Sequence, residues 1–358
     1  MQANFKKYNL NFKQASGTSR GILTEKETYI LEISDGDKKG IGECAIFRGL
    51  SYDDVPEYEE KLIWLCEHIN NNAEFLKSEL KHFPSIVFGL EQALLNLKYG
   101  KDLYFPSDFT DGKDSIKING LIWMGNADFM QKQIEEKLEK GFNCIKLKIG
   151  VDWESEKKVI QKLREKFPAE VIELRVDANG AFSFEEAKIV LQELAELKIH
   201  SIEQPIKKSE VRSPKSEENS EKKSTDCCDP WNEMAKLCAE TPTPIALDEE
   251  LIGVIDFEEK KKLLETIKPQ YIILKPALVG GFSGSDEWIA IAESLGINWW
   301  ITSALESNIG LNAICQYTYT KKNPLPQGLG TGALFTNNFE THLQLEGDQM
   351  WHKKTPYY

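Results

Sequence analysis

The sequence lacks any uninterrupted apolar run that approaches the length needed to cross a membrane. Its first residues, MQANFKKYNLNFKQ, also lack the apolar core of a secretory signal peptide. The seven cysteines are odd in number and scattered, without metal-type spacing, which is the pattern of reduced thiols. We therefore expect a cytoplasmic protein.

Positive charge is also scarce. The 57 acidic residues outnumber the 44 basic ones, so the formal net charge is −13 and the pI is near 5.1. This balance argues against nucleic acid or an anionic membrane surface as the main partner. At 358 residues, 41% of them hydrophobic, the chain can bury a large core as two domains or as one barrel with additions.

A repeated unit fills the middle of the chain. Seven segments each contain a short apolar run that ends in a polar residue, and amphipathic helical stretches lie between them. They are SIKINGLIW (115–123), NCIKLKIG (143–150), VIELRVDANG (171–180), IHSIEQP (199–205), TPIALDEE (243–250), QYIILKPA (270–277) and INWWITSA (297–304). With one exception the strand ends follow at intervals of 25 to 29 positions, about one strand–helix unit. Seven or eight such units in series predict a closed barrel of parallel strands.

The exception is the 45-position interval from Glu203 to Asp248. It contains residues 207–229, which include six basic residues, six acidic residues and five serines. A segment of this composition cannot bury a core, so we interpret it as a polar loop inserted in the barrel.

Residues 1–114 follow a different pattern. TYILEIS and KKGIGECAIF predict two strands around a DGDKKG turn, and two helical stretches follow, the second ended by Gly100. We expect an α+β capping domain over 1–114, a catalytic barrel over 115–330, and a C-terminal segment over 331–358 that packs on the capping domain and completes it.

Polar side chains stand at the ends of five consecutive predicted strands. From first to last these are Lys146 with Lys148, then Asp177, Glu203, Asp248 and Lys275. Alternation along GFNCIKLKIG places both lysines of the first strand on one face. Each residue alone is more often a turn residue, a helix cap or a surface lysine. Five strand ends in series favour one site at the mouth of the barrel, where (β/α) barrels bind their ligands.

The residue types at these positions indicate metal-assisted chemistry. Three carboxylates in one mouth repel one another unless a cation lies between them. An all-oxygen set suits Mg²⁺, with Mn²⁺ as the other candidate, better than zinc, which prefers His and Cys. A lysine desolvated near other cations has a lowered pKa and can act as a general base.

The motifs KLK, DANG, IEQP, LDE and ILKP resemble those of the enolase superfamily, in its muconate-lactonising-enzyme-like subgroup. The resemblance spans nearly the whole chain and implies a (β/α)7β modified TIM barrel with an α+β N-terminal capping domain. TSALESNIGL (302–311) and GLGTGALF (328–335) resemble the branch of this subgroup that serves menaquinone biosynthesis.

The resemblance implies a role for each site residue. The implied metal ligands are Asp177, Glu203 and Asp248, and the implied catalytic residues are Lys148 as base, Lys146 as its tuning partner and Lys275 as the cation that stabilises an enolate. Residues implied to hold these groups in place are Asn179 and Glu249. Implied substrate contacts are Arg20, in a segment that resembles a loop closing over the substrate, together with Ser303 and Glu306.

The implied reaction is a syn dehydration of 2-succinyl-6-hydroxy-2,4-cyclohexadiene-1-carboxylate to 2-succinylbenzoate, through an enediolate. The same site could racemise or epimerise an α-carbon. A dipeptide epimerase requires acids near the last strands, but Glu306 is the only acidic residue between Glu293 and Glu340. An anionic N-succinylamino acid therefore remains the alternative substrate. A non-catalytic binding barrel is disfavoured because no ligand or lysine is missing.

Overall fold

A three-stranded antiparallel sheet opens the chain in the computed structural model, which describes residues 1–18, 21–123, 127–209 and 231–357. Its strands are β1 (Gln2–Thr18), β2 (Gly21–Asp35) and β3 (Lys38–Cys44). Three helices accompany it, α1 (Tyr58–His68), α2 (Ala73–Glu79) and α3 (Pro84–Tyr99). The sheet and α3 pack so closely that a Cβ at Gly42 would lie 2.0 Å from the Gly89 carbonyl oxygen. The predicted strand pair corresponds to β2 and β3, and the two predicted helices correspond to α1 and α3. As predicted, α3 ends at Gly100, which has a positive φ.

The barrel follows as seven parallel strands hydrogen-bonded in the order β11-β10-β9-β8-β7-β6-β5. The strands are β5 (Gly120–Ile122), β6 (Cys144–Lys148), β7 (Glu173–Asp177), β8 (Ser201–Glu203), β9 (Ile245–Leu247), β10 (Tyr271–Leu274) and β11 (Asn298–Ile301). Each predicted strand end coincides with an observed one or lies one residue beyond it. The first predicted segment is divided, because residues 118–119 separate β5 from the short strand β4 (Ser115–Lys117).

An eighth segment closes the barrel between β11 and β4. Gln327 N donates to Lys117 O over 2.9 Å, and Gly328 N donates to Ile301 O over 2.8 Å. Gly328 is required at this close approach, because a Cβ there would lie 2.3 Å from Thr302 Oγ1. The result is the (β/α)7β arrangement expected from the sequence.

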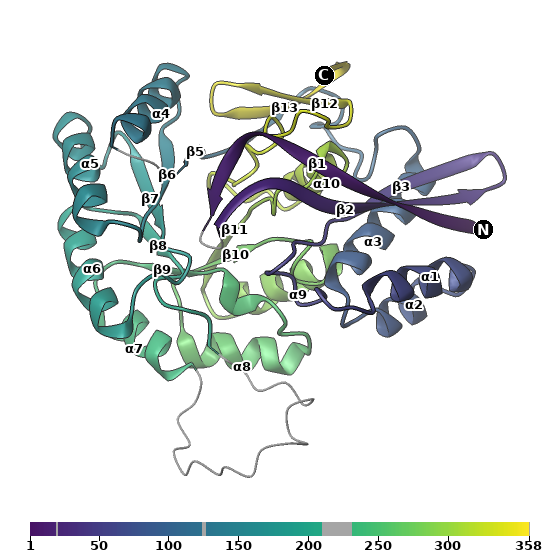
Figure 1. Ribbon diagram of the computed structural model, residues 1–358, viewed down its shortest axis with the longest axis horizontal. Coiled ribbons are helices and arrows are strands. Elements are labelled where there is room, and N and C mark those ends of the chain that lie inside the picture. The colour runs from purple at the N-terminus through teal and green to yellow at the C-terminus, as the bar shows by residue number, and fades with distance from the viewer. Residues whose placement is uncertain (19–20, 124–126, 210–230, 358) are drawn as a thin grey trace, which may run out of the picture.

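Helices cover the outside of the barrel strands, as Figure 1 shows most clearly for α4 to α7. They are α4 (Ala127–Glu139), α5 (Trp153–Lys166), α6 (Phe184–Glu196), α7 (Asn232–Glu240), α8 (Phe257–Ile267), α9 (Gly281–Ser294) and α10 (Asn308–Thr320). Their apolar faces and the outward strand residues form one continuous buried core. This packing keeps the strand ends, and therefore the predicted site residues, in fixed register.

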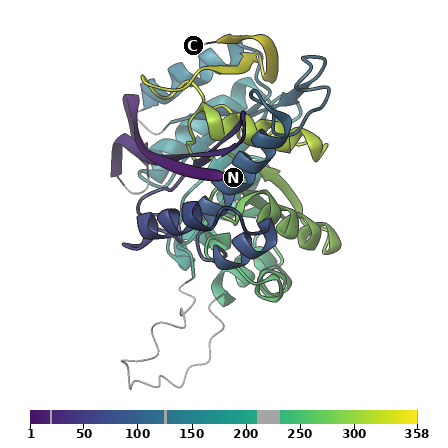
Figure 2. The ribbon, with the colours of Figure 1, turned by 90° about the vertical axis from the view of Figure 1, so that its right-hand side faces the viewer.

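The C-terminal segment contacts both strand β1 of the N-terminal sheet and strand β4, which precedes the barrel strands. Lys13 N donates to Leu334 O and Thr336 N donates to Asn11 O, which joins residues 334–336 to β1. The hairpin of β12 (Thr341–Glu346) and β13 (Gln349–Tyr357) pairs with β4 instead. Figures 1 and 2 show this yellow hairpin beside the barrel and the purple β1–β2 hairpin lying across it. The boundaries proposed from the sequence stay predictions.

Two sequence predictions fall on residues that the structure does not describe. Arg20 lies outside the described residues, as does the proposed polar insertion from residue 210 onward. Among the helices that are described, none is long and apolar enough to cross a membrane.

Candidate active site

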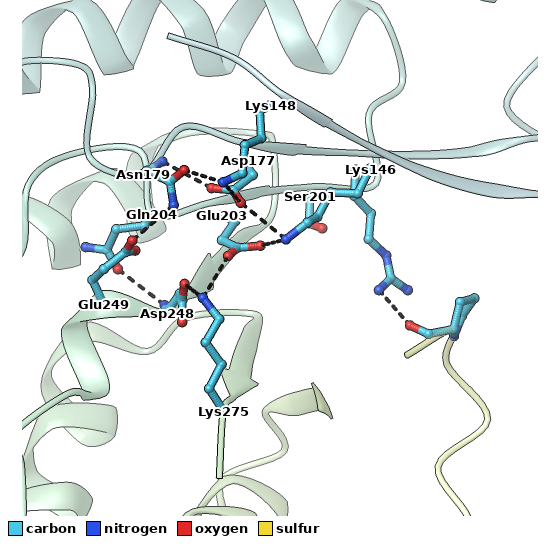
Figure 3. A network of polar contacts seen from close by, with 12 residues as sticks. Lys146, Lys148, Asp177, Asn179, Ser201, Glu203, Gln204, Asp248, Glu249 and Lys275 are labelled. Carbon is cyan, nitrogen blue, oxygen red and sulfur yellow. Dashed lines mark hydrogen bonds and ion pairs between the residues drawn. The ribbon is translucent and has the colours of Figure 1, made fainter. Parts of the chain in front are cut away.

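The polar strand ends meet because the parallel strands are in register. Lys148 of β6 is paired with Asp177 of β7, and Asp177 is paired with Glu203 of β8. Asp248 follows β9, and Lys275 follows β10. All of these side chains point into the mouth of the barrel, with the lysines approaching the carboxylates from different sides (Figure 3).

Lys146 and Lys148 bind the first two carboxylates. Lys146 Nζ donates to Glu203 Oε2 over 2.7 Å and to Asp177 Oδ2 over 3.2 Å. Lys148 Nζ donates to the same Asp177 oxygen over 2.9 Å. Lys275 approaches from the opposite side, pairs with Asp248 and lies 3.9 Å from Glu203 Oε1.

The pKa values of the acids show how this charge is shared. Burial opposes ionisation of Asp177, but the lysines, Lys148 foremost, outweigh it and hold the pKa of Asp177 well below its usual value. Burial and the negative charge of Asp177 raise the pKa of Glu203 to about 8. Burial also raises the pKa of Asp248, against the opposing charge of Lys275. Burial therefore outweighs the lysine charges at Glu203 and Asp248, whereas the lysine charges outweigh burial at Asp177.

The pKa values of Lys146 and Lys275 are raised by the same interactions. Burial alone would lower the pKa of Lys146, but the charges of Glu203 and Asp177 outweigh it and raise that pKa. Asp248 and Glu203 raise the pKa of Lys275 in the same way. The lowered pKa expected of a lysine base is absent from these two residues, because carboxylates rather than cations are their nearest partners.

Asn179 links Lys148 to Glu249 on the far side of the site. It accepts a hydrogen bond from Lys148 through Oδ1, and its Nδ2 donates to Glu249 Oε1 over 3.0 Å. Asn179 has a φ of 45°, a left-handed conformation that asparagine tolerates better than most residues. The placement of Asn179 and Glu249 fits the supporting role expected from the sequence, which stays a prediction.

The fit of a divalent cation rests on the chemistry of the donors. In the described parts of the chain, no three His, Cys, Asp or Glu side chains form a ready-made metal cluster, and lysines stand between the carboxylates instead. The carboxylate set is nevertheless buried and oxygen-only, and the buried oxygens Glu203 Oε1 and Glu249 Oε2 accept no hydrogen bond from any residue that the structure describes. Such donors suit a hard cation. Binding one requires the carboxylates to exchange their lysine partners for it.

A cavity of about 110 Å³ opens onto the lysines. Residues that line it besides the predicted lysines, Asp177, Asn179 and Glu249 include Phe47, Leu50, Trp123, Thr302, Ser303 and Thr331. The sequence predicted Ser303 among these. Thr302 could also have been found, since it is the polar residue at the end of β11. Phe47 and Leu50 belong to the N-terminal part of the chain, and no local pattern marks their position over the barrel.

Glu306 takes a different position from the other predicted substrate contacts. It does not line the cavity, and its Oε2 accepts hydrogen bonds from Ser303 Oγ over 2.6 Å and from Ala304 N over 2.7 Å. Its carboxylate therefore lies behind the cavity wall. Whether it contacts substrate stays a prediction.

Comparisons with known proteins agree with this architecture. The family described as "Enolase C-terminal domain-like" matches residues 129–216 and 226–351, and "MenC, N-terminal domain" matches residues 1–97. The o-succinylbenzoate synthase of Desulfotalea psychrophila is 41% identical over 380 residues, which cover 97% of this chain and 98% of that protein. The crystal structure of MenC from the same species superposes with a TM-score of 0.83 at 38% identity, covering 98% of this chain and 99% of that one.

A more distant relative is the N-succinylamino acid racemase of Thermus thermophilus, 29% identical over 313 residues, which cover 82% of this chain and 75% of that protein. The fold and the polar barrel mouth define the class of enolase-like barrels with an N-terminal capping domain. The chain belongs to the enolase superfamily and, within it, to the MenC family.

Proposed function

We propose that the protein is a lyase that dehydrates 2-succinyl-6-hydroxy-2,4-cyclohexadiene-1-carboxylate to 2-succinylbenzoate, the reaction of an o-succinylbenzoate synthase in menaquinone biosynthesis. The observation that carries this proposal is the approach of Lys148 and Lys275 to one carboxylate cluster from opposite sides. The 41% identity to the o-succinylbenzoate synthase over nearly the whole chain supports the choice of reaction.

In this proposal Lys148 removes the proton α to the substrate carboxylate. Lys148 lines the cavity at the mouth of the barrel, so it can reach a bound substrate. The protonated lysine then lies on the face from which hydroxide leaves, which accounts for a syn elimination. Lys146, buried beneath it, contacts the substrate carboxylate and adjusts the basicity of Lys148 by its charge.

Lys275 stabilises the enediolate with its positive charge. Charge that develops during the reaction is most effectively stabilised by groups already fixed in a water-poor site. Lys275 satisfies this condition, because its side chain is only 13% exposed and is held by Asp248. Asn179 and Glu249 keep Lys148 and its neighbours in position.

Asp177, Glu203 and Asp248 would hold Mg²⁺, with Mn²⁺ as the other candidate. A divalent cation supplies the concentrated positive charge that a dianionic enediolate needs. The raised pKa values of Glu203 and Asp248, which burial causes despite the neighbouring lysines, support this assignment, because a divalent cation would favour the ionised form of both acids.

A racemase is the second candidate, and the two-sided placement of the lysines favours it. A base on each face permits removal of an α-proton from one face and its return on the other. The Thermus thermophilus relative is named an N-succinylamino acid racemase. An anionic N-succinylamino acid would satisfy the same cavity, either as a side activity or as the main one.

We also propose a small-molecule carboxylate as the partner and the cytoplasm as the site of action. The five described cysteines Cys44, Cys66, Cys144, Cys238 and Cys315 are unpaired, which supports a reducing compartment.

The two functions are separated by a pair of assays on one preparation with Mg²⁺. Loss of the cyclohexadiene substrate is followed by absorbance, and racemisation of an N-succinylamino acid is followed by optical rotation. We expect the dehydration to be the more efficient by kcat/KM. Efficient racemisation without dehydration would replace the first proposal with the second.

A further inference from the structure

Gln204 lies among the proposed metal ligands (Figure 3) without being one of them. It directly follows Glu203 at the end of β8, and its side chain is fully buried. It does not line the cavity that opens onto the lysines. Any effect of Gln204 on the chemistry must therefore act through the residues that it binds.

The backbone of Gln204 leaves the sheet where the pairing of β8 with β9 ends. Gln204 N still donates to Ala246 O over 3.0 Å, as the parallel pairing requires. If the pairing continued, the next bond would run from Asp248 N to Gln204 O. Gln204 has a φ of 39°, however, and its carbonyl oxygen accepts from Gly180 N over 2.7 Å instead. This left-handed conformation costs energy for a glutamine and persists only when its surroundings impose it.

The carboxamide of Gln204 supplies the bond that its carbonyl oxygen does not. Its Oε1 accepts from Asp248 N over 3.3 Å and from Glu250 N over 3.2 Å. Its Nε2 donates to Ile206 O and to Glu250 Oε2, each over 3.1 Å. Both amide hydrogens and both acceptor positions are used, so these partners fix the orientation of the carboxamide.

Glu250 joins this carboxamide to the chain beyond β8. Its side chain is buried, and besides Gln204 its two carboxylate oxygens accept from Ser209 N over 3.2 and 3.3 Å. Glu250 lies two residues after Asp248. The segment that follows Glu203 and the turn that carries Asp248 are therefore bound to each other through Gln204 and Glu250.

Gln204 thus contacts the segment that belongs to each of the three proposed ligands. Its carbonyl oxygen binds Gly180, which lies three residues after Asp177, and its carboxamide binds the backbone of Asp248. Glu203 is its neighbour in the chain. A change in the Gln204 side chain is therefore expected to shift these ligands relative to one another.

We propose that Gln204 is a positioning residue for the metal site. Its main chain and its carboxamide hold the segments of Asp177, Glu203 and Asp248 in one arrangement, which allows the three carboxylates to bind a single Mg²⁺. Mg²⁺ demands near-ideal octahedral coordination, so a shift of one ligand weakens binding. This inference rests on the proposed function only in assigning the three acids to a divalent cation.

Titration calorimetry with Mg²⁺ on the substrate-free protein tests this role. Gln204→Met keeps an unbranched side chain of similar length but removes the four hydrogen bonds of the carboxamide. We expect its Mg²⁺ affinity to fall about 10- to 100-fold, the usual cost of losing a group that orients metal ligands.

The matched control is Gln92→Met in the N-terminal domain. Gln92 is equally buried, and its carboxamide also binds backbone groups, those of Glu43 and Phe88. We expect Gln92→Met to lower Tm as Gln204→Met does, because both leave buried backbone groups without partners. Its Mg²⁺ affinity is expected to stay within about threefold of the wild-type value, since Gln92 binds none of the segments that carry the ligands.

A second variant exchanges the two side chains of the pair, by Gln204→Glu together with Glu250→Gln. An oxygen at position 204 can again accept from the backbone N–H groups of residues 248 and 250, and the carboxamide at position 250 can donate to it. Of the four bonds only the one to Ile206 O is lost. We expect this exchange to recover most of the Mg²⁺ affinity that Gln204→Met loses, and it decides the question if Gln204→Met does not fold.

Wild-type Mg²⁺ affinity in Gln204→Met, an equal loss in Gln92→Met, or weak Mg²⁺ binding by the exchanged variant would each overturn the proposal. If the wild-type protein itself binds no Mg²⁺, the proposed metal site is refuted instead, and with it the basis of this inference.

Discussion

Lys148 Nζ donates a hydrogen bond to Asp177 Oδ2 over 2.9 Å, so the proposed base is in direct contact with the first proposed metal ligand. The two residues are also register partners on neighbouring strands, β6 and β7. Any change in the charge that balances Asp177 therefore changes the environment of the base. Metal binding and proton removal are expected to be coupled through this contact.

The metal site is tested by replacing its three acids. Asp177→Ala, Glu203→Ala and Asp248→Ala are each expected to lose divalent-metal affinity and activity while the protein remains folded, because each removes an oxygen ligand. Titration calorimetry with Mg²⁺ measures the loss, with Glu258→Gln on the exposed face of α8 as the control. Unchanged metal binding in all three variants would show that the cation binds elsewhere.

Asn179 is expected to support catalysis without binding metal itself. Asn179→Gly keeps a backbone that tolerates positive φ and removes only the side chain between Lys148 and Glu249. We expect kcat to fall about 10- to 100-fold, the usual cost of removing such a partner, while metal affinity is largely retained. Wild-type kcat in this variant would leave Asn179 with a purely local role.

Glu43 is expected to be a stability residue through its cap on α10. Glu43→Ala leaves the buried donors Ser307 N, Ser307 Oγ and Gly310 N without an acceptor. Loss of a cap and exposure of unsatisfied donors together cost about 2 to 4 kcal/mol. Chemical denaturation measures the difference, and Glu25→Ala on the exposed part of β2 provides the comparison. Equal stability of the Glu43→Ala and Glu25→Ala variants would contradict a stabilising role of Glu43 as the cap of α10.

His352 on β13 predicts how stability depends on pH. Burial, reinforced by the nearby His342, lowers the pKa of His352 from 6.5 to about 4. The unfolded chain therefore binds a proton at this position before the folded chain does, and stability falls as pH decreases from about 6.5 toward 4. His352→Phe removes this titration, so its Tm is expected to fall by a few degrees less than that of the wild type between pH 7 and pH 5. If Tm of the variant and of the wild type falls by the same amount between pH 7 and pH 5, His352 is excluded as a source of the pH dependence.

The barrel and the centre of the site could be predicted from the sequence because both follow from periodicity. The spacing of strand ends such as Lys148 and Asp177 is local information, and parallel register then brings them together. The N-terminal strand β1 was not predicted, although Tyr8, Leu10 and Phe12 alternate with two asparagines. Its contact with residues 334–336 is long-range and could not be read from the local pattern. The position of Glu306 behind the wall could not be read from the sequence either, since it depends on how the turn that contains Leu305 packs against residues of β1.

The central claim is that Lys148 is the base, and α-proton exchange in D₂O tests it most directly. Wild-type protein with Mg²⁺ is incubated with an unreactive substrate analogue, and deuterium incorporation is followed by NMR beside the dehydration assay. Lys148→Ala is expected to lose both activities, and Lys275→Ala to lose dehydration, while both variants retain metal binding by calorimetry. Removing a general base typically costs at least about 10² to 10⁴ in rate. If Lys148→Ala keeps more than about a tenth of wild-type turnover, its loss of rate is far smaller than this range. The base is then a different residue.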